Sequence, residues 1–98
     1  MNLQEVMATM KSKPETFLQN DCIFQLRAFI RGFIFSKNIA AEAICDDHIL
    51  LDAVDLQIKE LYGIKPSEII SIEEVLDDNE GDKAFDKYIE LWHKYVQQ

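Results

Sequence analysis

A chain of 98 residues, 48% apolar and 29% charged, has the size and composition of one globular domain. Its 18 acidic and 10 basic residues give a net charge of −8, which repels phosphate backbones and argues against nucleic-acid binding. No apolar run is long enough to cross a bilayer or to form a signal-peptide core. We therefore expect one domain over residues 1–98, with no membrane association, a cytoplasmic location and a monomeric state before it binds a partner.

Turn-forming residues are scarce in this sequence. Three glycines and two prolines are too few for the turns of a sandwich or barrel, so we predict an all-α fold, a single compact bundle of about four to six helices. The first helix is predicted to begin at Asn2, a favourable N-cap, and to end before Pro14. A loop then leads to Asn20 or Asp21, which we expect to cap the second helix.

The second helix is expected to be central, because apolar residues cover almost its full circumference. Arg27, Arg31 and Lys37 are predicted to form its polar edge. Gly32 lies inside this helix, where glycine costs roughly 1 kcal/mol relative to alanine. We interpret Gly32 as the point where another helix crosses.

A third helix is predicted from Asp46 or Asp47, either of which can cap it, to Gly63, which occupies the C′ position. A short segment from Ser67 to Leu76 follows. Within that segment, the S-x-x-E spacing of Ser71 and Glu74 is typical of a capping box.

The last helix is predicted to start at Asn79 or Asp82 and to continue to the C-terminus. Its aromatic residues recur at spacings of three and four, which favours a core position over an exposed stacking platform. They are Phe85, Tyr88, Trp92 and Tyr95.

The negative charge is concentrated in the later part of the chain. Up to Ala40 there are five basic and three acidic residues, whereas the remainder has five basic and fifteen acidic residues. One stretch of ten residues contains six carboxylates and no cation: Glu73, Glu74, Asp77, Asp78, Glu80 and Asp82.

A solvated loop beside a helix N-terminus explains this stretch about as well as a binding surface does. Six like charges repel one another, however, so a cationic partner would both attract them and relieve that repulsion. We therefore take these six residues as the first candidate contact surface for a basic protein. The second candidate set is Asp46, Asp47, Asp52 and Asp55.

Motifs for metal and cofactor binding are missing from the sequence. The stretch from Asp77 to Asp82 resembles a calcium loop, but position twelve of such a loop would fall on Lys87 or Tyr88 instead of an acid. His48 has no metal-binding spacing to the only other histidine, and no phosphate-binding or nucleophile motif occurs. We expect no cofactor, no metal and no enzymatic activity.

Both cysteines, Cys22 and Cys45, lie in apolar stretches without a metal or redox spacing. We expect them to be buried and reduced, as is usual for a cytosolic protein.

Two segments near the start of the chain resemble a known pattern. They are Pro14-x-x-Phe17-Leu18 and Leu26-x-x-Phe29-Ile30-x-Gly32-Phe33. This pattern resembles that of small helical immunity proteins of bacterial polymorphic-toxin and contact-dependent growth inhibition systems. The final segment with Ala84, Phe85 and Tyr88 is similar to the closing helix of such proteins.

The resemblance implies a cytoplasmic immunity protein that binds one cognate toxin C-terminal domain, frequently an RNase or DNase. A nuclease needs a cationic groove to hold its substrate, and an acidic surface can occlude such a groove. The alternative is an acidic helical adaptor or regulatory subunit that binds another basic protein. A small carboxylate-based enzyme is the third alternative, and it would need a pocket holding at least two acids with perturbed pKa values.

Overall fold

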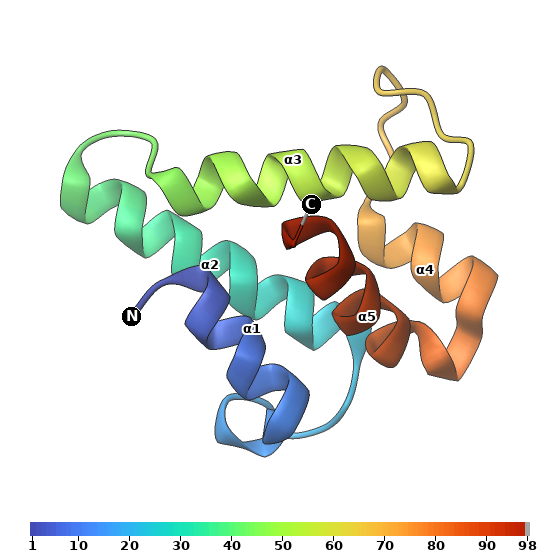
Figure 1. The fold of residues 1–98 in the computed structure, drawn as a ribbon, viewed down its shortest axis with the longest axis horizontal. Coiled ribbons are helices and arrows are strands. Elements are labelled where there is room, and N and C mark those ends of the chain that lie inside the picture. The colour runs from blue at the N-terminus through green and yellow to red at the C-terminus, as the bar shows by residue number, and fades with distance from the viewer. Residues whose placement is uncertain (98) are drawn as a thin grey trace.

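The structure is a computed structural model that describes residues 1–97. It contains five α-helices and two short 3₁₀ segments, η1 and η2, with no strand within those residues, so the all-α prediction is confirmed. In chain order the elements are α1 (Leu3–Ser12), η1 (Pro14–Thr16), α2 (Ile23–Ala41), α3 (Asp46–Leu61), α4 (Ile72–Glu80), η2 (Gly81–Lys83) and α5 (Ala84–Val96) (Figure 1).

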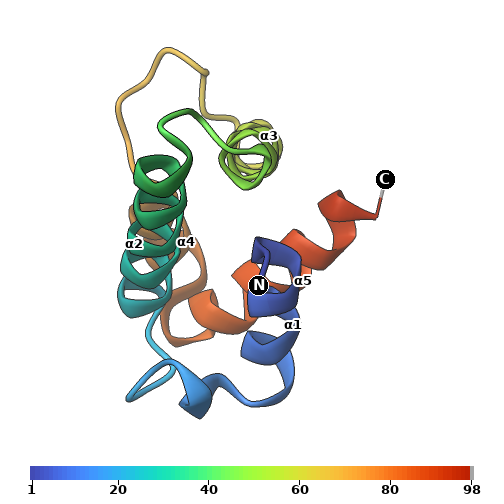
Figure 2. The same cartoon turned by 90° about the vertical axis from the view of Figure 1, so that its left-hand side faces the viewer.

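Four of the helices lie in two pairs on opposite sides of one core. Figure 2 shows α2 and α4 together on one side of the molecule and α1 and α5 on the other, with α3 seen end-on at the top, and in Figure 1 α3 runs along the top. The single tryptophan, Trp92 of α5, is 1% exposed at the centre. Tyr88 and Phe85 are also buried, which confirms most of the predicted aromatic core, while Tyr95 is only partly buried.

Three of the predicted helix ends are confirmed by their hydrogen bonds. The Asn2 side chain accepts from the Glu5 amide at 2.9 Å and the Glu5 side chain accepts from the Asn2 amide, which is a complete capping box. Ser71 caps α4 by accepting from the Glu74 amide at 3.2 Å. Gly63 follows α3 at C′ with φ +72°, and its amide and the next one donate back to the last turn of α3.

Other predicted boundaries are wrong by a few residues. The N-cap of α2 is Cys22 instead of Asn20 or Asp21, and the N-cap of α3 is Cys45 instead of Asp46 or Asp47. Neither cysteine side chain makes a capping hydrogen bond. Both cysteines are partly exposed free thiols, so the expectation of buried thiols is also wrong.

The start of the last helix is displaced by an extra turn. The segment η2 fills the space between α4 and α5, so α5 begins at Ala84 instead of Asn79 or Asp82. The short segment predicted from Ser67 to Leu76 is also displaced, because the helix here is Ile72–Glu80 and carries much of the acidic stretch.

Two expectations for α2 are wrong. Arg27 is 5% exposed and belongs to the core instead of the polar edge. A Cβ atom placed at Gly32 would meet no atom within 4 Å, so no other helix of this chain crosses α2 there. Gly32 instead lies on an exposed face of α2.

Candidate functional site

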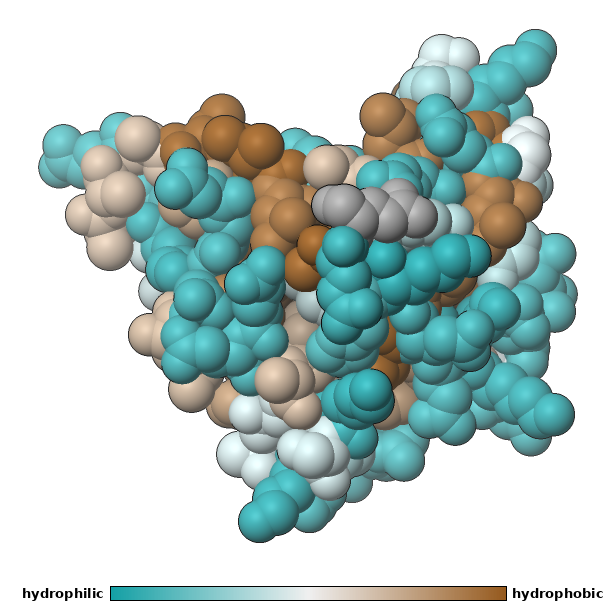
Figure 3. Space-filling view, viewed as in Figure 1, coloured by the Kyte–Doolittle hydropathy of each residue, from teal (hydrophilic) through white to brown (hydrophobic). Residues whose placement is uncertain are grey.

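Four carboxylates of the first predicted set form an exposed group on α4 and η2, which we call the α4 acidic surface. Its members are Glu74, Asp77, Asp78 and Asp82. None of the four makes an ion pair with any residue between 1 and 97. In Figure 3 hydrophilic side chains dominate the lower right of the molecule, where α4 and η2 lie.

The other two members of that set have intramolecular partners. Glu73 is 5% exposed and points into the protein, so it does not belong to an exposed contact surface. Glu80 is partly buried and accepts a 2.9 Å hydrogen bond from the Tyr62 hydroxyl. Burial and the adjacent Glu80 carboxylate raise the pKa of Tyr62 to about 12, which keeps this hydroxyl protonated as a donor.

The second predicted set is divided in the same way. Asp46 and Asp52 are exposed, and Asp52 lies 3.5 Å from the His48 ring. Asp47 accepts hydrogen bonds from the Leu3 amide at 3.1 Å and from Lys37 Nζ at 2.7 Å, so it ties the start of α1 to α2 and α3. The fourth member, Asp55, is largely buried in an ion pair. The structure therefore leaves Asp46 and Asp52 as surface candidates.

Arg27 is the centre of a buried ion cluster that joins four helices. Its guanidinium donates two 2.9 Å hydrogen bonds to the two carboxylate oxygens of Asp55 on α3. It also lies 3.5 Å from Glu73 of α4 and donates to the Tyr88 hydroxyl of α5 at 3.1 Å. Arg31, one turn further along α2, donates to the other oxygen of Glu73. This pairing offsets the cost of burying charge.

Burial and neighbouring charges shift the pKa values of several cluster members. Burial by itself would lower the pKa of Arg27, but the neighbouring Tyr88 and Asp55 outweigh it and the pKa is raised. For Glu73, burial favours the neutral acid, yet hydrogen bonds from Arg31 and the backbone lower its pKa below the ordinary value. Burial raises the pKa of Tyr88. Burial also raises the pKa of Asp55, although the Arg27 guanidinium opposes this shift. The cluster joins four helices and is a structural feature of the fold.

Two shallow grooves open on either side of the Arg27–Asp55 pair, between α2 and α3. One has a volume of about 340 Å³ and is walled by Phe35, Ile34 and Leu51, and the other has a volume of about 290 Å³ and extends towards Ile70. The charged groups at their floor already have partners, so neither groove presents a reactive constellation.

Within residues 1–97 no three metal-ligating side chains converge on one point. Over the same residues, no helix has the length and apolar character that spanning a bilayer requires. His93 has a buried Nε2 atom without a hydrogen-bond partner between α5 and α1, and burial lowers the pKa of its imidazole.

The chain matches no protein-family model, and no curated protein or solved structure is significantly similar to it.

Proposed function

We propose that this protein is an immunity protein that binds a basic toxin C-terminal domain, an RNase or DNase, and occludes its cationic active site. The observation that carries the proposal is the α4 acidic surface, whose four carboxylates are exposed and have no cationic partner within residues 1–97. Carboxylates held on a helix can lie where substrate phosphates would lie, and inhibition then requires no chemical step.

Electrostatics predicts how such a complex would form. Like charges on the α4 acidic surface repel one another in the free protein, and a basic partner relieves that repulsion while it is attracted. Such steering acts mainly on the association rate and weakens as salt screens the charges. Asp46 and Asp52, which are exposed on α3, are the second candidate contacts.

The test uses the C-terminal domain of the protein encoded by the reading frame directly before that of this chain, because immunity genes normally follow their toxin genes. We expect the two proteins to form a complex and the nuclease activity of the toxin domain to disappear. Changing Glu74→Gln, Asp77→Asn, Asp78→Asn and Asp82→Asn together should slow association about tenfold or more at low salt.

A matched control changes four exposed acids outside this surface: Glu15, Glu42, Glu60 and Glu68, each to Gln. The net charge changes equally, so a loss confined to the first variant locates the contact. A domain that binds without losing its activity would favour the adaptor alternative. Absence of binding would contradict the proposed function. Equal slowing of association by both variants would contradict the proposed site.

A further inference from the structure

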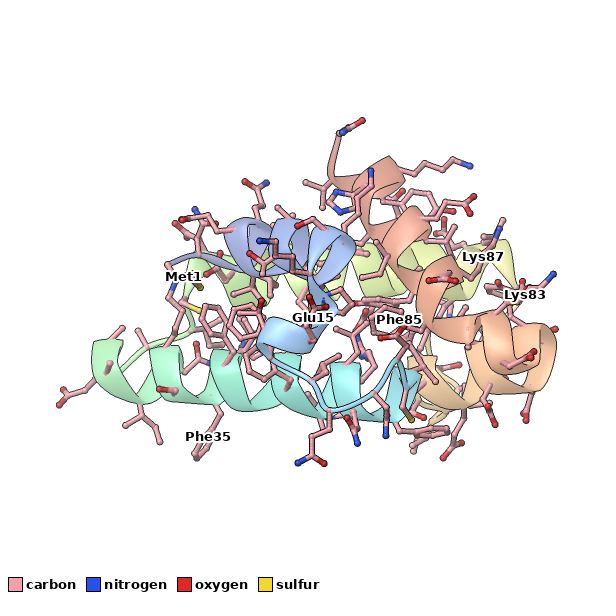
Figure 4. All side chains as sticks on the ribbon, turned by 90° about the horizontal axis from the view of Figure 1, so that it is seen from below. Met1, Glu15, Phe35, Lys83, Phe85 and Lys87 are labelled. Carbon is pink, nitrogen blue, oxygen red and sulfur yellow. The ribbon has the colours of Figure 1, made fainter. Side chains whose placement is uncertain are left out.

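The outward face of α2 has apolar residues that the fold leaves uncovered. Phe35 is 67% exposed, Ile39 is 61% exposed and Phe24 is 43% exposed. Together with the exposed small residues Ala28 and Gly32 they recur at spacings of three and four, which places all five on one side of the helix. We call these five residues the α2 face. In Figure 4, Phe35 extends below α2 and away from the rest of the molecule.

Gly32 lies in the middle of this face, and nothing inside the molecule requires a glycine there. A side chain at position 32 would contact no other atom, and the backbone of Gly32 has ordinary helical geometry. Glycine therefore lowers the stability of α2, and no contact inside the molecule requires it. A flat centre between two exposed phenylalanines lets the backbone of a second helix approach closely. Since no helix of residues 1–97 crosses there, the helix that fits must come from another molecule.

The charges around the α2 face indicate the chemistry of that molecule. At the N-terminal end of α2 a cavity of about 210 Å³ is lined by Asp21, Asp77 and Asp82, with Phe24 on its wall and no cation among its lining residues. Arg31, the exposed cation on α2 next to Gly32, is paired with Glu73 and lines the grooves on the α3 side, not this cavity. Lys83 and Lys87 line another cavity, and Figure 4 shows them far from Phe35. A lysine or arginine fits this cavity, because its aliphatic stem can contact the apolar wall while its charge meets the carboxylates.

We propose that the α2 face is the docking surface for one amphipathic helix of a basic partner, which inserts a lysine or arginine into the cavity beside Phe24. The distance from Phe24 to Ile39 is 15 residues of helix, or about 22 Å, so the partner helix spans about four turns. The inference rests on the proposed function only in taking the partner to be the toxin domain. The apolar contacts hold the complex together, whereas the α4 acidic surface accelerates its formation.

Two neutral substitutions test this proposal without altering the net charge. Phe35→Ser removes an exposed anchor, and Gly32→Gln places a bulky side chain at the flat centre while it improves helix propensity. Each should increase the dissociation rate of the complex with the toxin domain at least tenfold, and Gly32→Gln should do so while the protein becomes no less stable in urea. Ile69→Ser is the control, because Ile69 is a fully exposed apolar residue outside the α2 face.

A second probe makes the test independent of the toxin. It is a synthetic 18-residue helical peptide with leucines every third or fourth position and flanking lysines, titrated into ¹⁵N-labelled protein. The amide signals of Ala28, Gly32, Phe35 and Gly81 should shift together, and an analogue with glutamates in place of lysines should bind at least tenfold more weakly.

The outcomes separate the two proposals. If the toxin domain binds but neither α2 variant accelerates dissociation, the docking inference is wrong and the immunity function stands. If the toxin domain does not bind, the peptide decides alone: shifts along the α2 face support a basic helical partner of another kind. Shifts elsewhere, or equal binding of the glutamate analogue, overturn the inference.

Discussion

Replacing Arg27 by methionine should be among the most damaging single changes in this protein. Methionine fills the space of the aliphatic stem but removes every polar contact of the guanidinium. Asp55 then loses its only ion pair, the Tyr88 hydroxyl loses its hydrogen-bond partner, and Glu73 keeps only Arg31. The side chain of Asp55 is 20% exposed and that of Arg27 is 6% exposed, so water compensates only a small part of the loss.

Removing one partner of a buried ion pair typically costs about 3–5 kcal/mol. The residual exposure of Asp55 favours the lower end, about 3 kcal/mol, which is a large fraction of the ~5–15 kcal/mol stability of a small domain. With an m-value of about 1 kcal/mol/M, the urea midpoint should fall by about 3 M. Trp92 is the single tryptophan and lies at the centre of the core, so its fluorescence reports the transition, with far-ultraviolet circular dichroism as the second probe.

Two further variants isolate the cause. Arg31→Met makes the same change one turn away, where the arginine side chain is 52% exposed, and should cost less than about 1 kcal/mol. Adding Asp55→Leu to Arg27→Met removes the stranded carboxylate, so the double variant should be more stable than Arg27→Met alone. The reasoning is refuted if Arg27→Met costs no more than Arg31→Met, or if Asp55→Leu adds a further loss.

Two other predictions follow from the geometry. Because the pKa of Glu73 is lowered, its carboxylate stabilises the fold above the unfolded pKa of about 4.3, and this stability is lost as the pH falls through the folded pKa. Glu73→Gln should therefore cost about 1–3 kcal/mol at pH 7 and less at pH 3, as measured by urea unfolding at both pH values. For the glycines the expected signs are opposite: Gly63→Ala should destabilise by about 1 kcal/mol, because its φ is +72°, while Gly32→Ala should stabilise by up to about 1 kcal/mol. Losses at both glycines would contradict the helix geometry on which the second prediction depends.

Local signals in the sequence predicted the features that depend on neighbouring residues. Asn2, Ser71 and Gly63 each act within three or four residues of their own position, and all three have the predicted role. The predicted N-caps of α2 and α3 were wrong for different reasons. Asn20 and Asp21 are followed by Cys22, at which α2 begins, whereas Asp46 and Asp47 come after Cys45 and form the first turn of α3. Where a helix begins is then decided by packing of its first turn instead of by a capping side chain.

The ion cluster could not be predicted from local signals, since its members come from four helices. One signal for Arg27 was nevertheless present: on a helical wheel it lies among Ile23, Ile30 and Ile34, inside the apolar arc. A charge at such a position must be paired when the arc is buried. Glu73 pairs with Arg27 and Arg31, and for this reason it is not part of the exposed contact surface. The sequence also contained a signal for the α2 face. Apolar residues cover almost the full circumference of this helix, and helices packed on one side of it cannot bury all of them.

The packing of α1 against α5 has a consequence for how the chain folds as it is synthesised. All four buried residues of α1 are 0% exposed: Leu3, Val6, Met7 and Met10. A helix of 10 residues is too short to persist alone in water, and α5, the helix beside it, is synthesised after α2, α3 and α4 (Figures 1 and 2). We therefore expect α1 to stay largely unstructured until α5 has been synthesised, and hydrogen exchange of α1 should report a late step of folding.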